Sequence, residues 1–213
     1  MISYCLKYKF IIFMCLLSLT STGLASQSWK FKVYLDEQEI GEHTFQSVSL
    51  NNKTHIQINA KFDVYILFIN AYSYKHMNYE VWNGQCLQSI RSTTDDNGEE
   101  LYVQADYSGG QLIIKTPTTD YTAEGCIKTF AYWEPDFLKS QTLLNAQTGK
   151  LMPVTIDMIG EEIIMVRSKL TAATHYRLTT DEFIIDLWYS KDNEWLALNS
   201  TTSNGSTLRY QIQ

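Results

Sequence analysis

The chain has 213 residues, a length that corresponds to one domain or at most two. Hydrophobic residues make up 45% of it and charged residues 19%, which excludes a disordered chain and a collagen-like repeat. The formal net charge of −6 argues against a general nucleic-acid binder, because such proteins neutralise phosphates with a basic surface. The aromatic content of 13% favours a fold rich in β-strands.

The N-terminal segment has the pattern of a secretory signal peptide. Lys7 and Lys9 provide a positive region, residues 10–19 form an apolar run, and small residues lead up to Ala25. The run is about half of the ~20 residues that a membrane-spanning helix needs, and an uncleaved membrane anchor is the alternative. Cys15 lies inside the run, so it does not form a lipoprotein signal. We expect cleavage after Ala25 and export of the mature chain.

Residues 26–213 show a two-residue alternation of apolar and polar side chains, as at Phe31, Val33 and Leu35. Such alternation is typical of antiparallel strands with one buried face. Asn-Gly and Gly-Gly pairs recur between the alternating segments and favour two-residue hairpin turns. We therefore expect a single all-β domain, a curved antiparallel meander that forms a half-barrel or a barrel. It would hold about 11 or 12 strands, some ranges merging, within 29–36, 40–49, 53–65, 70–82, 86–94, 100–107, 111–116, 151–158, 162–169, 172–179, 183–190, 194–201 and 206–212.

Residues 117–150 interrupt the alternation and predict a long crossover or cap over one end of the sheet. Within them, residues 133–139 place a proline early and an acid in the first turn, which favours one short helix. Cys86 and Cys126 are the cysteines that remain after signal cleavage, and an even count in an exported chain predicts one disulfide. The alternative is two buried thiols that act as small apolar side chains.

The sequence carries no recognisable catalytic or metal-binding motif. The four histidines His43, His55, His76 and His175 are scattered, and neither mature cysteine has a CxxC partner, so zinc binding has no support. The patterns GxSxG, GxGxxG and GxxxxGK[ST] are absent. The acidic run 95–100 lacks the ligand spacing of a calcium loop and predicts a hairpin tip. We expect no cofactor and no metal, and we assign no catalytic residue.

The most unusual segment is the aromatic stretch 62–82. Residues 64–69 are apolar at almost every position, so we expect a strand there that is covered on both faces. Alternate aromatic side chains after it would share one face and line a groove for a lipid or another apolar ligand. The alternative is a strand that only fills the core of the sheet. The candidate ligand-binding residues are Tyr72, Tyr74, His76, Trp82, Trp133 and Trp188.

Several short phrases are spread over most of the chain after residue 25. They are Trp29-x-Phe31-x-Val33-x-Leu35-Asp36, Ile40-Gly41-x-His43-x-Phe45, Glu80-x-Trp82, Thr94-Asp-Asp-Asn-Gly98, Tyr132-Trp133, Leu144-Asn145-x-Gln147-Thr148-Gly149, Tyr176-x-Leu178 and Leu187-Trp188-Tyr189. Together they resemble an uncharacterised family of exported bacterial proteins that is known as a domain of unknown function. More distantly, the chain looks like the curved antiparallel half-barrels of periplasmic lipoprotein and lipid carriers. The resemblance implies a β fold and a periplasmic location, and it supplies no catalytic residues.

These observations favour a soluble periplasmic protein that binds an apolar or amphipathic ligand, such as a lipid, on the concave side of its sheet. Such a protein would bind no nucleic acid and would keep no integral membrane segment after signal cleavage. One alternative is an envelope scaffold or assembly partner without a small ligand. Another is a hydrolase that uses His76 or His175 with Glu80 or Asp186.

Overall fold

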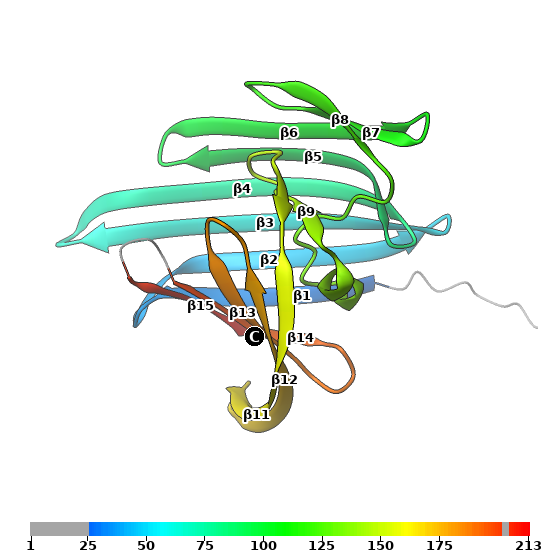
Figure 1. The fold of residues 1–213 in the computed structure, drawn as a ribbon. Helices are drawn as coiled ribbons and strands as arrows, with labels where there is room; N and C mark the ends of the chain where they lie inside the picture. Colours follow the sequence, from blue (N-terminus) through cyan, green and yellow to red (C-terminus); the bar gives the residue numbers. More distant parts are fainter. Residues whose placement is uncertain (1–25, 202–204) are drawn as a thin grey trace, which may run out of the picture.

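The computed structural model describes residues 26–201 and 205–213, and most of them lie in β-strands (Figure 1). The predicted signal peptide lies outside the described residues. The elements are β1 (Ser26–Leu35), β2 (Gln38–Leu50), β3 (Lys53–Ile66), β4 (Ile69–Asn83), β5 (Cys86–Asp96), β6 (Glu99–Ser108), β7 (Gln111–Lys115), β8 (Asp120–Glu124), the 3-10 helix η1 (Pro135–Lys139), β9 (Thr142–Leu144), β10 (Leu151–Pro153), β11 (Thr155–Val166), β12 (Lys169–Thr179), β13 (Ile184–Tyr189), β14 (Trp195–Thr201) and β15 (Thr207–Ile212).

Thirteen strands form one antiparallel sheet in the order β11-β12-β13-β14-β15-β1-β2-β3-β4-β5-β6-β7-β8. The last strand β15 pairs with the first strand β1. The N-terminal and C-terminal strands therefore lie side by side in the middle of the sheet order and join the two halves of the chain into one sheet. Its edge strands β8 and β11 are not paired with each other in the described part of the chain, and the sheet stays open. The predicted all-β meander is therefore confirmed, in its half-barrel form.

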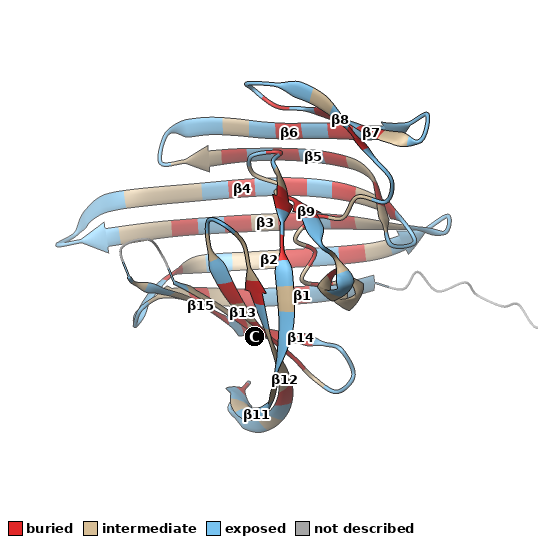
Figure 2. Ribbon diagram, in the orientation of Figure 1, coloured by how far each residue is buried: buried red, intermediate tan, exposed pale blue. Residues whose placement is uncertain are grey.

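Alternation sorts side chains between a buried concave face and an exposed convex face, and Figure 2 shows the resulting bands along β2–β6. On β1, Phe31 and Val33 are fully buried. Lys30 precedes Phe31, and Lys32 lies between Phe31 and Val33. Both lysines point outward and make ion pairs of 2.8 Å with glutamates of β2. Because successive side chains of a strand point to opposite faces, the two-residue pattern in the sequence is enough to place this core.

The predicted strand boundaries are wrong in the region 151–169. The sequence suggested a break near residues 159–161, but β11 runs unbroken from Thr155 to Val166 and turns at Arg167–Ser168. The pairing of β11 with β12 shifts register between Met158 and Gly160. A β-bulge therefore accommodates Ile159 as the extra residue, and the strand continues past it.

The prediction that residues 64–69 form a strand covered on both faces is also wrong. Ile66 of β3 pairs with Ile69 of β4, so Leu67 and Phe68 form the two-residue turn between these strands. Phe68 is 99% exposed and Leu67 is 85% exposed. The apolar run thus marks a hairpin tip, a place where two-residue turns usually carry glycine or asparagine.

The connection between β8 and β11 crosses the concave face and fills one end of it. The disulfide between Cys86 and Cys126, which the sequence predicted, ties the start of the connection to β5. The expected short helix is η1, and Trp133 just before it packs against Trp29 and Trp82, with ring centroids 6.5 and 5.6 Å apart. These tryptophans close that end of the concave face.

Candidate ligand-binding site

The concave face of β4 carries a row of alternate side chains that changes from aromatic to polar along the strand and ends in a tryptophan. The row begins near the β3–β4 turn and becomes steadily more buried toward the end of the strand. Sequence reasoning predicted that its first three members share a face, and the structure places them so. The members are Tyr72, Tyr74, His76, Asn78, Glu80 and Trp82.

A cavity of about 910 Å³, here called the open-end cavity, lies at the start of this row. It is a recess in the core, because wall residues such as Ile40, Phe62 and Tyr210 are each only 7% exposed. The cavity sits at the end of the sheet that carries the β1–β2 and β3–β4 turns and the start of β15. Its lining is Leu35, Asp36, Gln38, Ile40, His43, Phe62, Val64, Ile66, Ala71, Tyr72, Tyr74, Ser206, Leu208 and Tyr210.

The two tyrosines on the concave face of β4 are held in place by their hydroxyl groups. Tyr72 Oη donates to Asp96 Oδ1 at 2.6 Å, and Tyr74 Oη donates to Gln147 Oε1 at 3.1 Å. Gln147 in turn donates to the second oxygen of Asp96, which joins the connection to β5. Burial and the bond to Asp96 raise the pKa of Tyr72, so its hydroxyl stays protonated. The polar tips are satisfied, and the rings present apolar surface to the cavity.

A second cavity of about 200 Å³, here called the inner chamber, lies deeper on the concave face, around Glu80. The Glu80 carboxyl group accepts hydrogen bonds from Asn78 Nδ2 and Trp82 Nε1, both at 2.8 Å, and from Thr129 Oγ1 at 3.3 Å. Burial raises the pKa of Glu80, and these three donors oppose that effect. Asn78 Oδ1 and His43 Nε2, both buried, meet no hydrogen-bond partner among the described residues. The chamber therefore offers unsatisfied polar atoms to a ligand.

The open-end cavity and the inner chamber adjoin each other at three shared residues, His43, Tyr74 and Tyr210. His43 Nδ1 and Tyr210 Oη are hydrogen bonded at 3.3 Å, and Tyr74 stacks on Phe62 with a centroid distance of 5.3 Å. Together they form an aromatic boundary between an apolar space and a polar one. An amphipathic molecule that crossed this boundary would find a suitable surface for each of its parts.

The histidines beside the chamber are neutral at ordinary pH. Burial, with a smaller contribution from neighbouring His76, lowers the pKa of His43 to about 3. Burial also lowers the pKa of His76 to about 4, and its Nδ1 is hydrogen bonded to Thr94 Oγ1 at 2.8 Å. A neutral ring in a buried site is the expected result of desolvation.

Three predicted ligand-binding residues lie elsewhere. Trp82, Trp133 and Trp188 are not in the lining of the open-end cavity or of the inner chamber, as the described residues form them. Trp82 and Trp133 belong to the closed end of the concave face. Trp188 stacks on His175 at 4.6 Å and donates to Glu162 Oε1. The sequence pattern showed which aromatic side chains face the core, but it did not show which of them line a cavity and which pack against other side chains.

Of the pairs suggested for a hydrolase, His175 and Asp186 are in contact, whereas the hydrogen bonds of Glu80 do not involve His76. His175 Nε2 lies 2.8 Å from Asp186 Oδ1, and its Nδ1 lies 3.0 Å from Glu162 Oε1, so both ring nitrogens are already bound to carboxylates. Asp186 also accepts from Arg177. Glu80 takes its hydrogen bonds from Asn78, Trp82 and Thr129 rather than from His76.

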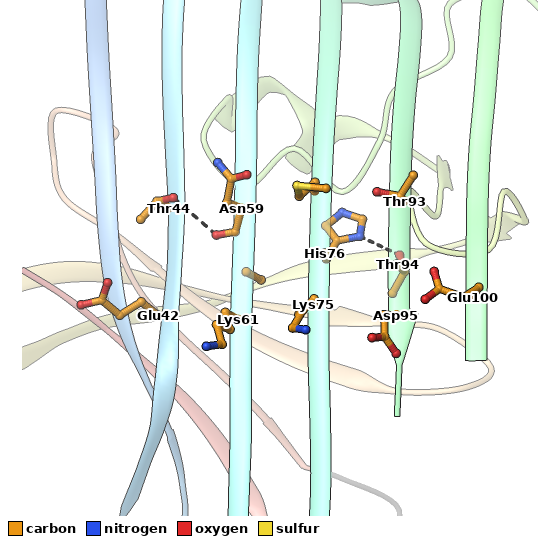
Figure 3. Close-up of a pocket in the computed structure, with 12 residues that line it drawn as sticks. Glu42, Thr44, Asn59, Lys61, Lys75, His76, Thr93, Thr94, Asp95 and Glu100 are labelled. Atoms are coloured by element: carbon orange, nitrogen blue, oxygen red, sulfur yellow. Dashed lines mark hydrogen bonds between the residues drawn. The ribbon is translucent and has the colours of Figure 1, made fainter. Parts of the chain in front are cut away.

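The convex face of β2–β6 has a depression of about 590 Å³, drawn in Figure 3. Figure 3 shows charged side chains of both signs side by side across these strands, and the strand register pairs each with its neighbour. Such cross-strand charges are solvated and partly neutralise one another. The depression is therefore a weaker candidate than the concave cavities. The charged row is Glu42, Lys61, Lys75, Asp95 and Glu100.

Among the residues of the concave site that sequence reasoning missed are His43, Asn78, Gln147 and Tyr210. Asn78 could have been found, because it continues the alternate positions of Tyr72, Tyr74 and His76. His43 and Tyr210 lie on β2 and β15, and their approach depends on the pairing of β15 with β1. Gln147 comes from the connection, whose path over the sheet has no signal in the local sequence.

Comparison with known proteins places this fold in a family. The model of a domain of unknown function, DUF6134, matches residues 31–213. The chain belongs to this family. The resemblance to a family of unknown function, predicted from short phrases, is thus confirmed. No curated protein matches the sequence.

A solved structure shares the fold. The crystal structure of a beta-barrel-like protein of the domain of unknown function DUF1849 from Brucella abortus has a TM-score of 0.65 to this chain. The two are 10% identical, and the match covers 89% of this chain and 96% of that one. At this identity the similarity shows a common fold alone. In the part of the chain that the structure describes, no helix has the length and apolarity to cross a membrane.

Proposed function

We propose that this protein binds an amphipathic ligand, such as a lipid, in the open-end cavity and the inner chamber. The observation that carries the proposal is the junction of the two spaces at His43, Tyr74 and Tyr210. The apolar part of the ligand would occupy the larger space, where Phe62 and Leu208 contribute apolar walls. Burial of an apolar chain there is favourable by roughly 0.8 kcal/mol per CH₂ group.

The polar part of the ligand would reach the inner chamber. Asn78 Oδ1 and the Glu80 carboxyl group are both hydrogen-bond acceptors, so they favour a group that donates, such as a hydroxyl or an amide. An unpaired acceptor in a buried site costs free energy, and a donor from the ligand would recover it. This arrangement favours a ligand with a small donor group over a pure hydrocarbon.

The proposed place of action is the periplasm, after removal of residues 1–25. The support is the N-terminal sequence pattern together with the disulfide between Cys86 and Cys126, since disulfides persist in oxidising compartments. Reading the N-terminus of the exported protein tests this part of the proposal. A retained N-terminal segment would contradict it.

Native mass spectrometry of the gently purified protein tests the binding directly. We expect an added mass of lipid size in wild type and its loss in Ala71→Trp, because Ala71 lines the open-end cavity and an indole would fill the mouth. Ala172→Trp is the matched control, since Ala172 is exposed on β12, away from the cavity. A wild-type protein that carries no ligand and takes up neither fatty acid nor phospholipid would contradict the proposal.

A scaffold without a small ligand remains the second candidate, and one observation favours it. The edge strand β11 exposes a series of apolar side chains, and an exposed apolar edge is a common site of strand pairing with another protein. Cross-linking in the envelope, followed by identification of the partner, tests it. The side chains are Met158, Ile159, Ile163 and Met165.

A further inference from the structure

The turn between β3 and β4 exposes four consecutive apolar side chains. Ile66 is 61% exposed, Leu67 85%, Phe68 99% and Ile69 70%. Figure 1 shows that this hairpin extends past the neighbouring turns, and Figure 2 shows that its whole end is exposed. Exposure of these side chains to water is unfavourable, because the folded chain loses the free energy that their burial in the core would provide.

The backbone of this turn is also unfavourable for its residues. Leu67 has a φ of 49° and Phe68 a φ of 68°, in the left-handed region that large side chains avoid. Three other two-residue turns carry Asn51-Asn52, Asn97-Gly98 and Gly109-Gly110, which suit this conformation, while Arg167-Ser168 adopts it with less suited residues. Backbone strain of this kind is often found at functional sites. The tip therefore lowers the stability of the fold in two ways: its large side chains adopt a left-handed backbone conformation, and they leave apolar surface exposed to water.

The tip lies at the rim of the open-end cavity. Val64 and Ile66 on one side of the hairpin, and Ala71 and Tyr72 on the other, line that cavity directly. Tyr65, 49% exposed, flanks the tip with an amphipathic ring of the kind found at membrane interfaces. A surface that received the tip would therefore face the mouth of the cavity.

We propose that the β3–β4 tip inserts into the surface of a lipid bilayer. The tip projects as a narrow point, and a fluid layer can accept such a point without a preformed pocket. No lysine or arginine occurs within residues 63–72, and Asp63 is acidic, so attraction to anionic lipid does not drive the insertion. The insertion is hydrophobic, and we expect it on neutral bilayers, with little change when anionic lipid is added or salt is raised.

Flotation with phosphatidylcholine and phosphatidylethanolamine vesicles tests the inference. We use purified protein whose N-terminus is read by mass spectrometry, and we compare wild type with the double variant L67N/F68G. The variant removes two large apolar side chains and supplies the residues that this turn prefers. We expect its partitioning to fall about a hundredfold or more, while its Tm equals or exceeds that of wild type. The inference is overturned if wild type does not float, or if both proteins float equally.

The double variant M165S/L170S is the matched control. Met165 and Leu170 are 65% and 73% exposed and face each other near another turn, on β11 and β12. Their loss should leave flotation unchanged, and an equal loss would show that any exposed apolar pair suffices and would overturn the inference. Phe68→Trp gives a second readout, because brominated lipid should quench the new indole in the membrane. A lack of quenching would contradict insertion of the tip.

Insertion of the tip into a bilayer does not require that the cavity binds a ligand, and the experiments test the two properties separately. Vesicle binding in a protein that carries and takes up no ligand would contradict the ligand proposal and leave the tip inference intact. Ligand in the purified protein, together with failure to bind vesicles, would do the reverse. In that case a protein partner with its own apolar pocket, or a second copy of this chain, becomes the occupant of the tip.

Discussion

The two ends of the concave face are built from the same strands but hold different contents. At one end Trp29 of β1 and Trp82 of β4 pack against Trp133 of the connection. At the other end the same two strands reach Leu35 and Tyr72, which face a cavity of about 910 Å³. Alternation thus decides which side chains turn inward, and the path of residues 125–154 decides which of them are covered.

From this difference we infer that the closed end stabilises the fold, whereas the open end provides the cavity in which a ligand can bind. The closed end is joined by a disulfide and by large aromatic contacts, which are the interactions with the largest effects on stability. The open end contains tyrosines whose hydroxyls are bonded at the periphery while their rings meet empty volume. Substitutions at the two ends should therefore have opposite consequences for folding and for ligand binding.

The largest expected effect is at the closed end. Trp133→Ala removes an indole that is 8% exposed and leaves a cavity between two other tryptophans. We expect the free energy of unfolding to fall by about 3–5 kcal/mol, as for other large-to-small changes of buried aromatics. Chemical denaturation of the purified variant measures this. A loss below about 1 kcal/mol would mean that this end is not tightly packed.

Removal of the disulfide should have the next largest effect. Replacing both Cys86 and Cys126 by serine frees a loop of 40 residues in the unfolded chain. We expect a loss of about 2–4 kcal/mol in the free energy of unfolding, mainly because the unfolded chain gains conformational freedom. Comparison of oxidised and reduced wild type by urea denaturation is the control. Equal stability of the two forms would show that the bridge does not hold the connection in place.

A pH series tests the buried boundary between the two cavities. Burial lowers the pKa of His43 to about 3 from an ordinary value near 6.5, so at intermediate pH the unfolded chain binds a proton that the folded chain excludes. The contribution of His43 to stability is complete above pH ~6.5 and is lost as the pH falls toward 3, at about 1.4 kcal/mol per pH unit. His43→Asn should reduce the slope by that amount between pH 6 and 4. An unchanged slope would show that the ring is accessible to water.

The smallest effect on stability is expected at the open end. Tyr72→Phe removes the hydrogen bond to Asp96, which lies at the edge of the cavity. We expect a change of no more than about 1.5 kcal/mol in the free energy of unfolding, together with a measurable change in ligand retention. Thermal unfolding and native mass spectrometry of the same sample check both. A loss as large as that of Trp133→Ala would remove the distinction between the two ends.

The sequence was informative where structure depends on local pattern. Alternation predicted the strands, and the even cysteine count predicted the bridge between Cys86 and Cys126. The sequence was not informative where the environment of a residue depends on segments that are distant in the chain. The apolar run 64–69 looked like a buried strand, because nothing local distinguishes a covered run from an exposed turn at Leu67 and Phe68. A groove beside Tyr72 and Tyr74 was expected, but its extent could not be predicted, since it depends on where residues 125–154 cross the sheet.

Nuclear magnetic resonance during titration with a lysophospholipid tests the central claim most directly. The methyl group of Ala71 reports on the open-end cavity, and the indole N–H of Trp133 reports on the closed end of the same face. We predict a saturable shift of the Ala71 signal while the Trp133 signal stays in place. A titration that moves neither signal, or that moves the signal of Trp133 first, would contradict the account.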